Sequence, residues 1–201
     1  REVRNLINKN VVNIFSCWNG FAALKSDGSI VSWGGWSMSN LEVVLPKNVE
    51  LELNSGVVSV FSTGEAMAAL KEDGSVVTWG SKDDGGDSSK VKDKLSSKVI
   101  NIFSTNSAFA ALKSDGSVVT WGSKKRGGES YSVAENLQSD VVHIYSSGRS
   151  FAALKNDGTV ISWGEKANEF SSHSSSQPIS GVVSISTPFL DDKSQAIKGK
   201  K

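Results

Sequence analysis

The chain has 201 residues, of which 38% are hydrophobic, a size and composition sufficient for a domain with a packed core. Its 22 basic and 21 acidic side chains leave a formal net charge of +1, so overall charge gives no reason to expect nucleic acid or an anionic membrane as a partner. No apolar run is long enough for membrane insertion, and a single cysteine, Cys17, excludes an internal disulfide.

One short motif recurs along the chain at nearly constant spacing. A six-residue run rich in Val, Ile and Phe begins at Val11 and returns at Val57, Val99 and Val141, and a partial copy begins near Val182. Successive starts lie roughly 42 residues apart, within the range of periods that marks solenoids, propellers and repeat arrays. The repeat therefore governs the prediction of the fold.

Each repeat unit predicts three strands. The Val-rich run is followed by a second apolar run ending in Ala-Ala-Leu-Lys, then by Asp-Gly, and then by a third run ending in Trp-Gly. Runs of β-branched and aromatic residues favour strands, and Asp-Gly between two apolar runs is the strongest short-range signal of a β-hairpin. The Trp that ends each third run is expected to pack between adjacent sheets. These Trp are Trp33, Trp79, Trp121 and Trp163.

The segments that join the units are less regular. After Trp-Gly the chain is rich in Gly, Ser and charged residues, and Val and Leu then recur four residues apart, as at Val91 and Leu95. This spacing fits one helical turn, and a short fourth strand is the alternative. Residues 1–10 fit the tail of a preceding half-repeat, and the last unit lacks its third strand. Ring closure, docking of a partner or a longer parent protein would account for these two ends.

The sequence predicts an all-β fold over residues 1–201, built from tandem units of about 42 residues with three to four antiparallel strands each. A β-propeller, or an arc of propeller-like blades, is the first choice, because neighbouring units can cover apolar faces that an isolated sheet would expose. An open solenoid-like stack is the alternative, and it would leave two sheet edges exposed.

Residues 11–164 resemble the repeats of the regulator-of-chromosome-condensation family. The third unit carries the pattern in Ala110–Leu112, Asp115–Gly116, Val118–Gly122 and Gly127–Gly128. The resemblance implies a β-propeller, commonly of seven blades, used for protein or chromatin binding and, in one branch, for nucleotide exchange on a small GTPase.

The sequence also departs from the family pattern. The family's Gly-Gln-Leu-Gly after Trp-Gly is replaced by Gly85–Ser88 and Gly127–Ser130, and Phe or Met replaces the family's His in the second strand. The units are shorter than the usual blade, and four and a fraction of them do not make seven. The pattern indicates a divergent branch, so the exchange-factor role is not carried over and no residue takes a family catalytic role.

Residues that suggest chemistry have simpler structural explanations. Cys17 and His143 would suit a thiol nucleophile and its base, but both occupy repeat positions that accept any small or polar residue. The carboxylates within Asp83–Asp87 suggest Ca²⁺, yet the next unit has Lys124–Arg126 at the matching place. Without aromatic neighbours, such basic runs are weak evidence for nucleic acid. We predict no catalytic residue, no metal and no cofactor.

Function is predicted where the repeat copies differ. Two loops vary in each unit, one between the first two strands and one after Trp-Gly, and equivalent loops of stacked or radial repeats line up on one surface. Aromatic and Arg side chains are the usual anchors of binding surfaces. The candidate binding residues are Trp18, Asn19, Trp36, Glu65, Tyr131 and Arg149.

The first functional hypothesis is a non-catalytic binding or scaffold module that recognises protein or carbohydrate through these loops. The second is a structural module that self-associates head-to-tail through its half-repeats. An enzyme, or an exchange factor for a small GTPase, comes last because no acid/base pair or nucleophile stands out. The low cysteine content is compatible with a secreted or cell-surface location and also with the cytoplasm.

Overall fold

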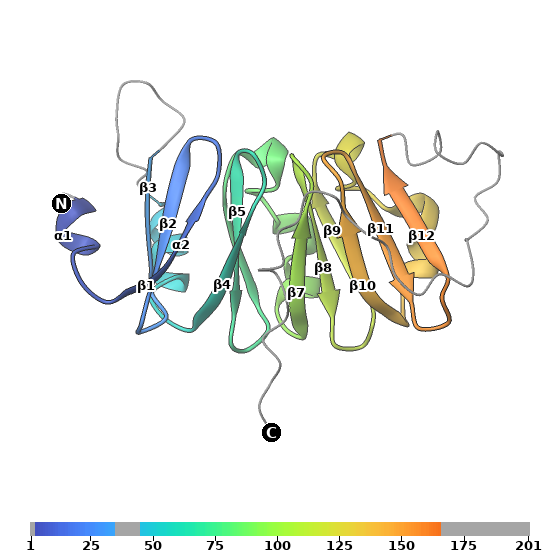
Figure 1. Cartoon of the computed structure of the whole chain (residues 1–201), viewed down its shortest axis with the longest axis horizontal. Helices are drawn as coiled ribbons and strands as arrows, with labels where there is room; N and C mark the ends of the chain where they lie inside the picture. Colours follow the sequence, from blue (N-terminus) through green and yellow to red (C-terminus); the bar gives the residue numbers. More distant parts are fainter. Residues whose placement is uncertain (1–2, 35–44, 166–201) are drawn as a thin grey trace.

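The protein is a row of small antiparallel sheets that stand side by side (Figure 1). The computed structural model describes residues 3–34 and 45–165. Within these ranges each repeat unit forms one sheet from three consecutive strands. The strands are β1 (Val11–Ser16), β2 (Gly20–Lys25) and β3 (Ile30–Gly34); β4 (Val57–Ser62), β5 (Ala66–Lys71) and β6 (Val76–Gly80); β7 (Val99–Ser104), β8 (Ala108–Lys113) and β9 (Val118–Gly122); and β10 (Val141–Ser146), β11 (Ser150–Lys155) and β12 (Val160–Gly164).

The Asp-Gly pair forms the hairpin turn between the second and third strands of each sheet. In the second unit, Oδ1 of Asp73 accepts the backbone N–H of Ser75 at 2.9 Å and its hydroxyl at 2.6 Å. Gly74 has a φ of +76°, a left-handed conformation that favours glycine. A Cβ there would also lie 2.7 Å from the backbone N of Lys98 in the next unit. The turn therefore requires glycine for its own geometry and for the close approach of the neighbouring unit.

The hydrophobic core lies between neighbouring sheets. Between the second and third sheets, the small side chains of β5, such as Ala66 and Ala68, face Phe109 and Trp121, and all four are buried. The rings of Phe109 and Trp121 stack with centroids 5.2 Å apart, and Nε1 of Trp121 donates to the carbonyl of Gly85 at 3.0 Å. The same arrangement recurs one unit further on. The prediction that the repeated Trp packs between sheets is confirmed for Trp79, Trp121 and Trp163.

Short helical turns connect the sheets. Three of them end at or beside a buried Leu that closes the interface between two sheets, namely Leu53, Leu95 and Leu137. The spacing of Val and Leu thus marks a helical turn, and the described sheets contain three strands each. The turns are α1 (Val3–Leu6), α2 (Lys47–Glu52), η1 (Lys82–Asp84), η2 (Ser89–Leu95), η3 (Lys124–Arg126) and η4 (Tyr131–Leu137), where η denotes a 3₁₀-helix.

The observed fold matches the expectation of consecutive propeller-type blades. The first and fourth sheets stand at opposite ends of the row in Figure 1, so the described residues form an open arc of blades. The partial unit expected from Val182 lies outside the described residues. Among residues 3–34 and 45–165, no helix has the length and apolar character needed to cross a membrane.

The packing of the repeated Trp leads to a first prediction. Replacing Trp121 by Ala removes a buried ring and its hydrogen bond, so we expect a loss of about 3–5 kcal/mol in the free energy of unfolding. Trp33, at the open end of the row, is only half-buried, so Trp33→Ala should cost clearly less. Urea denaturation followed by circular dichroism measures both values, and equal losses at the two sites would contradict the proposed packing.

The hairpin turns lead to a prediction about pH. Hydrogen bonds from Ser75 lower the pKa of Asp73 from its ordinary value of 3.8. Hydrogen bonds from the residue two positions further on likewise lower the pKa values of the three equivalent carboxyl groups, those of Asp27, Asp115 and Asp157. A carboxylate whose pKa is lower in the folded state adds stability above the unfolded-state pKa, and that stability is lost as pH falls through the folded-state pKa. The urea midpoint should therefore decline from about pH 4 downward. Asp73→Asn, which keeps an acceptor for Ser75, should make that decline shallower, and an unchanged pH profile would contradict this.

Candidate functional site

The loops between the first and second strands of the four units form one continuous edge, which we call the loop ridge (residues 17–19, 63–65, 105–107 and 147–149). The middle residues of these loops are joined by backbone hydrogen bonds that run from each unit to the next. The N–H of Trp18 donates to the backbone carbonyl of Gly64 at 2.8 Å. In the same way the N–H of Gly64 donates to the carbonyl of Asn106 at 2.8 Å, and the N–H of Asn106 to the carbonyl of Gly148 at 3.1 Å. The ridge is thus a fixed backbone platform rather than four independent loops.

The first residue of each ridge loop has a structural role. Oγ1 of Thr63 accepts the N–H of Ala66 at 2.9 Å and donates to the carbonyl of Asp84 at 3.1 Å, and this threonine is buried. Thr105 makes the corresponding bonds in the third unit. Cys17 occupies the same position in the first unit, where its Sγ donates to the carbonyl of Gly20 at 3.6 Å. The thiol therefore takes the place of the hydroxyl that anchors the loop.

Trp18 lies on the loop ridge with 72% of its surface exposed. Its indole rests on the neighbouring loop, because a Cβ added to Gly64 would lie 2.9 Å from Trp18 Cε2. The absence of a side chain at position 64 thus provides the surface on which the indole packs. Trp18 reaches toward the second unit rather than covering the first, so it is an exposed aromatic group held at one end of the ridge.

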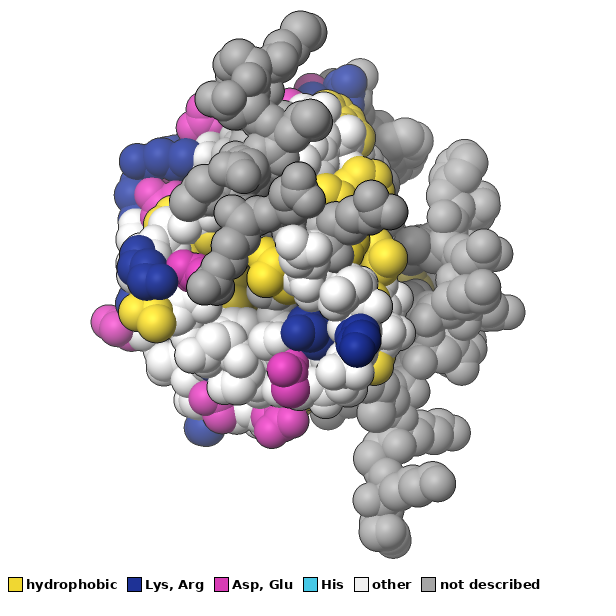
Figure 2. All heavy atoms as spheres, turned by 90° about the vertical axis from the view of Figure 1, so that its left-hand side faces the viewer, with side chains coloured by type: hydrophobic (Ala, Val, Ile, Leu, Met, Phe, Trp, Pro, Cys, Tyr) yellow, Lys and Arg dark blue, Asp and Glu magenta, His cyan; other side chains and the backbone are white. Residues whose placement is uncertain are grey.

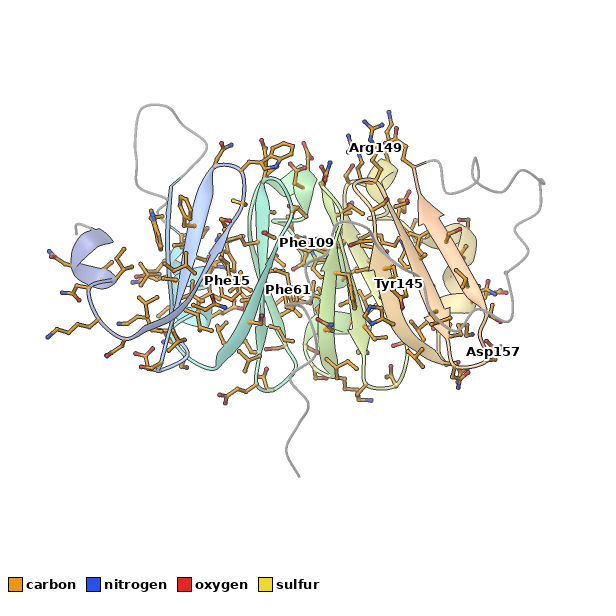
Figure 3. All side chains as sticks on the ribbon, in the orientation of Figure 1. Phe15, Phe61, Phe109, Tyr145, Arg149 and Asp157 are labelled. Atoms are coloured by element: carbon orange, nitrogen blue, oxygen red, sulfur yellow. The ribbon has the colours of Figure 1, made fainter. Side chains whose placement is uncertain are left out.

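Arg149 stands at the other end of the loop ridge, at the upper edge in Figure 3. Its Nη1 lies 3.3 Å from Oε1 of Glu165, whose second oxygen lies 3.4 Å from Nε of Arg126. One carboxylate between two guanidinium groups leaves a local excess of positive charge. Ion pairs this accessible contribute at most about 1 kcal/mol to stability. Glu165 therefore orients Arg149 more than it stabilises the fold.

The remaining candidates are placed differently. Asn19 is exposed and Glu65 half-buried, and both occupy the third position of a ridge loop. Tyr131 is 82% exposed, but it begins η4, and the preceding Ser130 has its Oγ 3.1 Å from Oγ1 of Thr120 in the middle of β9. Tyr131 is therefore separate from the loop ridge. Trp36 lies outside the described residues.

The structure does not assemble the chemical groups weighed from the sequence. Cys17 lies beside the first sheet and His143 in the fourth, at opposite ends of the row, so they cannot act together. The His143 ring packs against Phe103 and Tyr145, with centroids 5.1 and 4.5 Å away, and burial lowers the pKa of its imidazole. Within the described part of the chain, no group of three or more His, Cys, Asp or Glu side chains is arranged to hold a metal ion.

Sequence reasoning missed a row of exposed apolar side chains on the first strands. The pairing of each first strand with its neighbour shifts after the opening residue, so the second residue occupies a β-bulge. A bulge turns its extra residue away from the regular pleat. We call these residues the apolar row: Val12, Val58, Ile100 and Val142, all exposed. The partly buried Phe15, Phe61 and Tyr145 lie on the same strands (Figure 3). The sequence does carry a signal for this row, because each first strand opens with two β-branched residues in succession. Successive side chains of a regular strand point to opposite faces, so the two cannot both face the same side.

Three solved structures share this fold at low sequence identity. Prp20p from Saccharomyces cerevisiae is 19% identical with a TM-score of 0.51, covering 77% of this chain and 43% of that one. A second structure of yeast RCC1 (Prp20) is 19% identical with a TM-score of 0.50, covering 77% and 42%. Human WBSCR16 is 20% identical with a TM-score of 0.50, covering 77% and 47%.

The chain therefore spans less than half the length of each of these structures. No family model matches the sequence, and a search of curated proteins finds no match either. The likeness to Prp20 and WBSCR16 shows that the repeat units have the fold of RCC1-like propeller blades.

The packing of Trp18 on Gly64 leads to a prediction about the loop ridge. A methyl group at position 64 must displace the indole, so Gly64→Ala should increase the quenching of Trp18 fluorescence by acrylamide. Stability should change by less than about 1 kcal/mol because Trp18 is exposed. Gly148→Ala is the matched control, since its Cβ would meet only the side-chain amide of Asn106 at 3.3 Å. Repeating the measurement with Trp18→Phe shows which part of the fluorescence comes from Trp18. Equal quenching in the wild type and in Gly64→Ala would contradict the contact between the indole and Gly64.

Proposed function

We propose that this chain is a non-catalytic protein-binding module that holds its partner on the loop ridge. The observation that carries the proposal is the combination of a fixed backbone with exposed anchors. Hydrogen bonds between units hold the ridge loops in line, while the side chains of Trp18 and Arg149 remain accessible. A surface that is already ordered loses less conformational entropy on binding, and Trp and Arg are the side chains that most often dominate binding energy.

The shape and chemistry of the surface favour a protein as the ligand. The anchors lie in the first and fourth units, so a partner that contacts both must extend over four sheets. Small molecules bind in concave sites that enclose most of their surface, whereas an extended edge suits a macromolecule. The apolar row lies near the other end of the first strands, beside the hairpin turns, so it is a separate surface and does not extend the ridge. The near-zero net charge does not favour nucleic acid.

The proteins with similar structures support protein binding as the class of function. The structure of Prp20p is described together with its binding to Gsp1p and histones, and the second yeast structure contains Kap60 bound to RCC1. Each of those partners is a protein. Since this chain covers less than half of Prp20, the support extends to protein binding and not to any one partner or to nucleotide exchange.

A protein array probed with the purified chain, followed by measurement of Kd for the strongest hit, tests the proposal. Trp18→Ala and Arg149→Ala should each weaken binding at least tenfold, which corresponds to about 1.4 kcal/mol. Melting curves of both variants should stay close to that of the wild type, because both side chains are exposed.

Tyr131→Ala is the matched control for Trp18→Ala, since Tyr131 is also an exposed aromatic residue but lies away from the loop ridge. Its Kd should equal that of the wild type. Equal binding by all three variants would place the partner elsewhere on the molecule. Capture of glycans without proteins on a parallel array, or faster release of GDP from a small GTPase, would replace the proposal with the corresponding alternative.

A further inference from the structure

Two 3₁₀ turns beside the loop ridge carry side chains of opposite charge. They are η1 and η3, which occupy the same position in the second and third units. A buried threonine ties each turn to a ridge loop. Oγ1 of Thr63 donates to the carbonyl of Asp84 at 3.1 Å, and Oγ1 of Thr105 to the carbonyl of Arg126 at 3.0 Å. The side chains of both turns therefore lie next to the ridge.

The two turns have the same backbone, so the fold does not require the change of charge. Each is closed by a hydrogen bond of 3.4 Å from the glycine that follows it to the carbonyl of its first residue. That first residue is a lysine in both, and it pairs with an acidic residue beyond the turn: Lys82 with Asp87 at 3.5 Å and Lys124 with Glu129 at 2.9 Å. The next two residues are Asp-Asp in η1 and Lys-Arg in η3.

Charge is thus separated along the ridge by unit. We call the carboxylates of the second unit the acidic section: Glu65, Asp83 and Asp84. We call the cations of the third and fourth units the basic section: Lys125, Arg126 and Arg149. None of the three carboxylates forms an ion pair with a described residue, and Glu165 offsets only part of the basic section. The uncharged Asn106 and Ser107 belong to the ridge loop between the two sections.

Other parts of the described surface mix the two signs of charge. In Figure 2, which faces the first unit, Lys and Arg side chains lie close to Asp and Glu side chains. Near the hairpin turns, Nζ of Lys98 lies 3.9 Å from Oδ2 of Asp115, and in α2 Nζ of Lys47 lies 3.0 Å from Oε2 of Glu50. Interspersed charges of this kind largely cancel at a distance, whereas separated charges present a field to a partner.

We propose that the protein held on the loop ridge presents basic side chains to the acidic section and acidic side chains to the basic section. This proposal rests on the proposed function, because it names the chemistry of the partner at the same site. Complementary charges speed association and fix the register of a complex, and a reversed orientation brings like charges together. The two sections therefore set the direction in which the partner lies along the row.

Two synthetic peptides of identical composition test the charge pattern. The block peptide has lysines at one end, a Gly-Ser spacer and glutamates at the other end, whereas lysine and glutamate alternate in the second peptide. In NMR titrations of the isotope-labelled chain at low ionic strength, the block peptide should bind at least about threefold more tightly, because only it places several opposite charges on each section. Added salt should weaken its binding. Equal Kd values for the two peptides would overturn the proposal.

A spin label on the block peptide tests the direction of binding. Attached to the lysine end, the label should broaden the amide signals of Glu65 and Asp83 more than those of Lys125 and Arg149, because an unpaired electron broadens the signals of nearby nuclei. Attached to the glutamate end, it should give the reverse pattern. Broadening of both sections to the same extent by either label would exclude the proposed direction.

Charge reversal at matched positions assigns the binding to the ridge. Asp83 and Lys125 are the second residues of η1 and η3, and both are exposed. Asp83→Lys should raise the Kd of the block peptide at least about threefold, and adding Lys125→Asp, which restores the net charge, should raise it further. The melting curves of both variants should match that of the wild type.

Asp93→Lys is the matched control, because it makes the same change in η2. The carbonyl of the adjacent Lys94 accepts Nζ of Lys113, which ends β8 beside the hairpin turn, so Asp93 lies away from the loop ridge. Its Kd for the block peptide should equal that of the wild type. Equal weakening by Asp83→Lys and Asp93→Lys would show that overall charge, and not the ridge, governs the binding.

The strongest protein hit from the array separates this proposal from the proposed function. Its Kd should rise in the double variant with Asp83→Lys and Lys125→Asp. If that Kd responds to Trp18→Ala and Arg149→Ala but not to the double variant, the ridge binds protein without a charge pattern, so this proposal fails while the proposed function stands. If the Kd responds to none of these substitutions, both fail.

Discussion

The structure depends on the contact between one three-stranded sheet and the next. Strand runs such as Ala-Ala-Leu and Val-Val-Thr-Trp put apolar side chains on both faces of a sheet, and three strands cannot cover either face themselves. The interface works because its two sides differ in size. Alanines of one second strand provide a flat surface, and the stacked Phe and Trp of the next unit fill the space above it. Small side chains on one side and large ones on the other give close packing.

The same contact constrains the polar parts of the repeat. Because the sheets approach closely, the hairpin of one unit meets the backbone that opens the next, and a Cβ at Gly116 would lie 2.6 Å from the N of Asp140. The tryptophan of one unit also donates to a linker glycine of the unit before it. Asp-Gly and Trp-Gly therefore recur because each fits a neighbour as well as its own strand. The side chain of the third residue in each ridge loop is under fewer such packing constraints, which is why this residue varies between units.

The sequence predicted the features that depend on one unit and its period. Val, Ile and aromatic runs, the Asp-Gly turn and the Trp that ends the third strand led to the strands and to the burial of Trp121. It did not predict features that depend on the exact alignment of neighbouring strands and loops. The packing of Trp18 on Gly64 requires knowing that these loops are adjacent, and the exposure of Val58 requires knowing that β4 contains a bulge. Repetition was read as a sign of structural residues, yet the apolar row is repeated and exposed.

The first sheet has one face that no other described sheet covers, and the physics of a repeat array shows what this means for stability. In such an array, stability is approximately the sum of unit terms and nearest-neighbour interface terms. An interior unit has two interfaces, whereas within the described residues the first unit has one, with Ile14 and Phe21 exposed on its other face. A protein that covers this face supplies the missing interface term and stabilises the folded state by mass action. The first unit should therefore gain most from whatever binds there, which ties its stability to the occupancy of its open face.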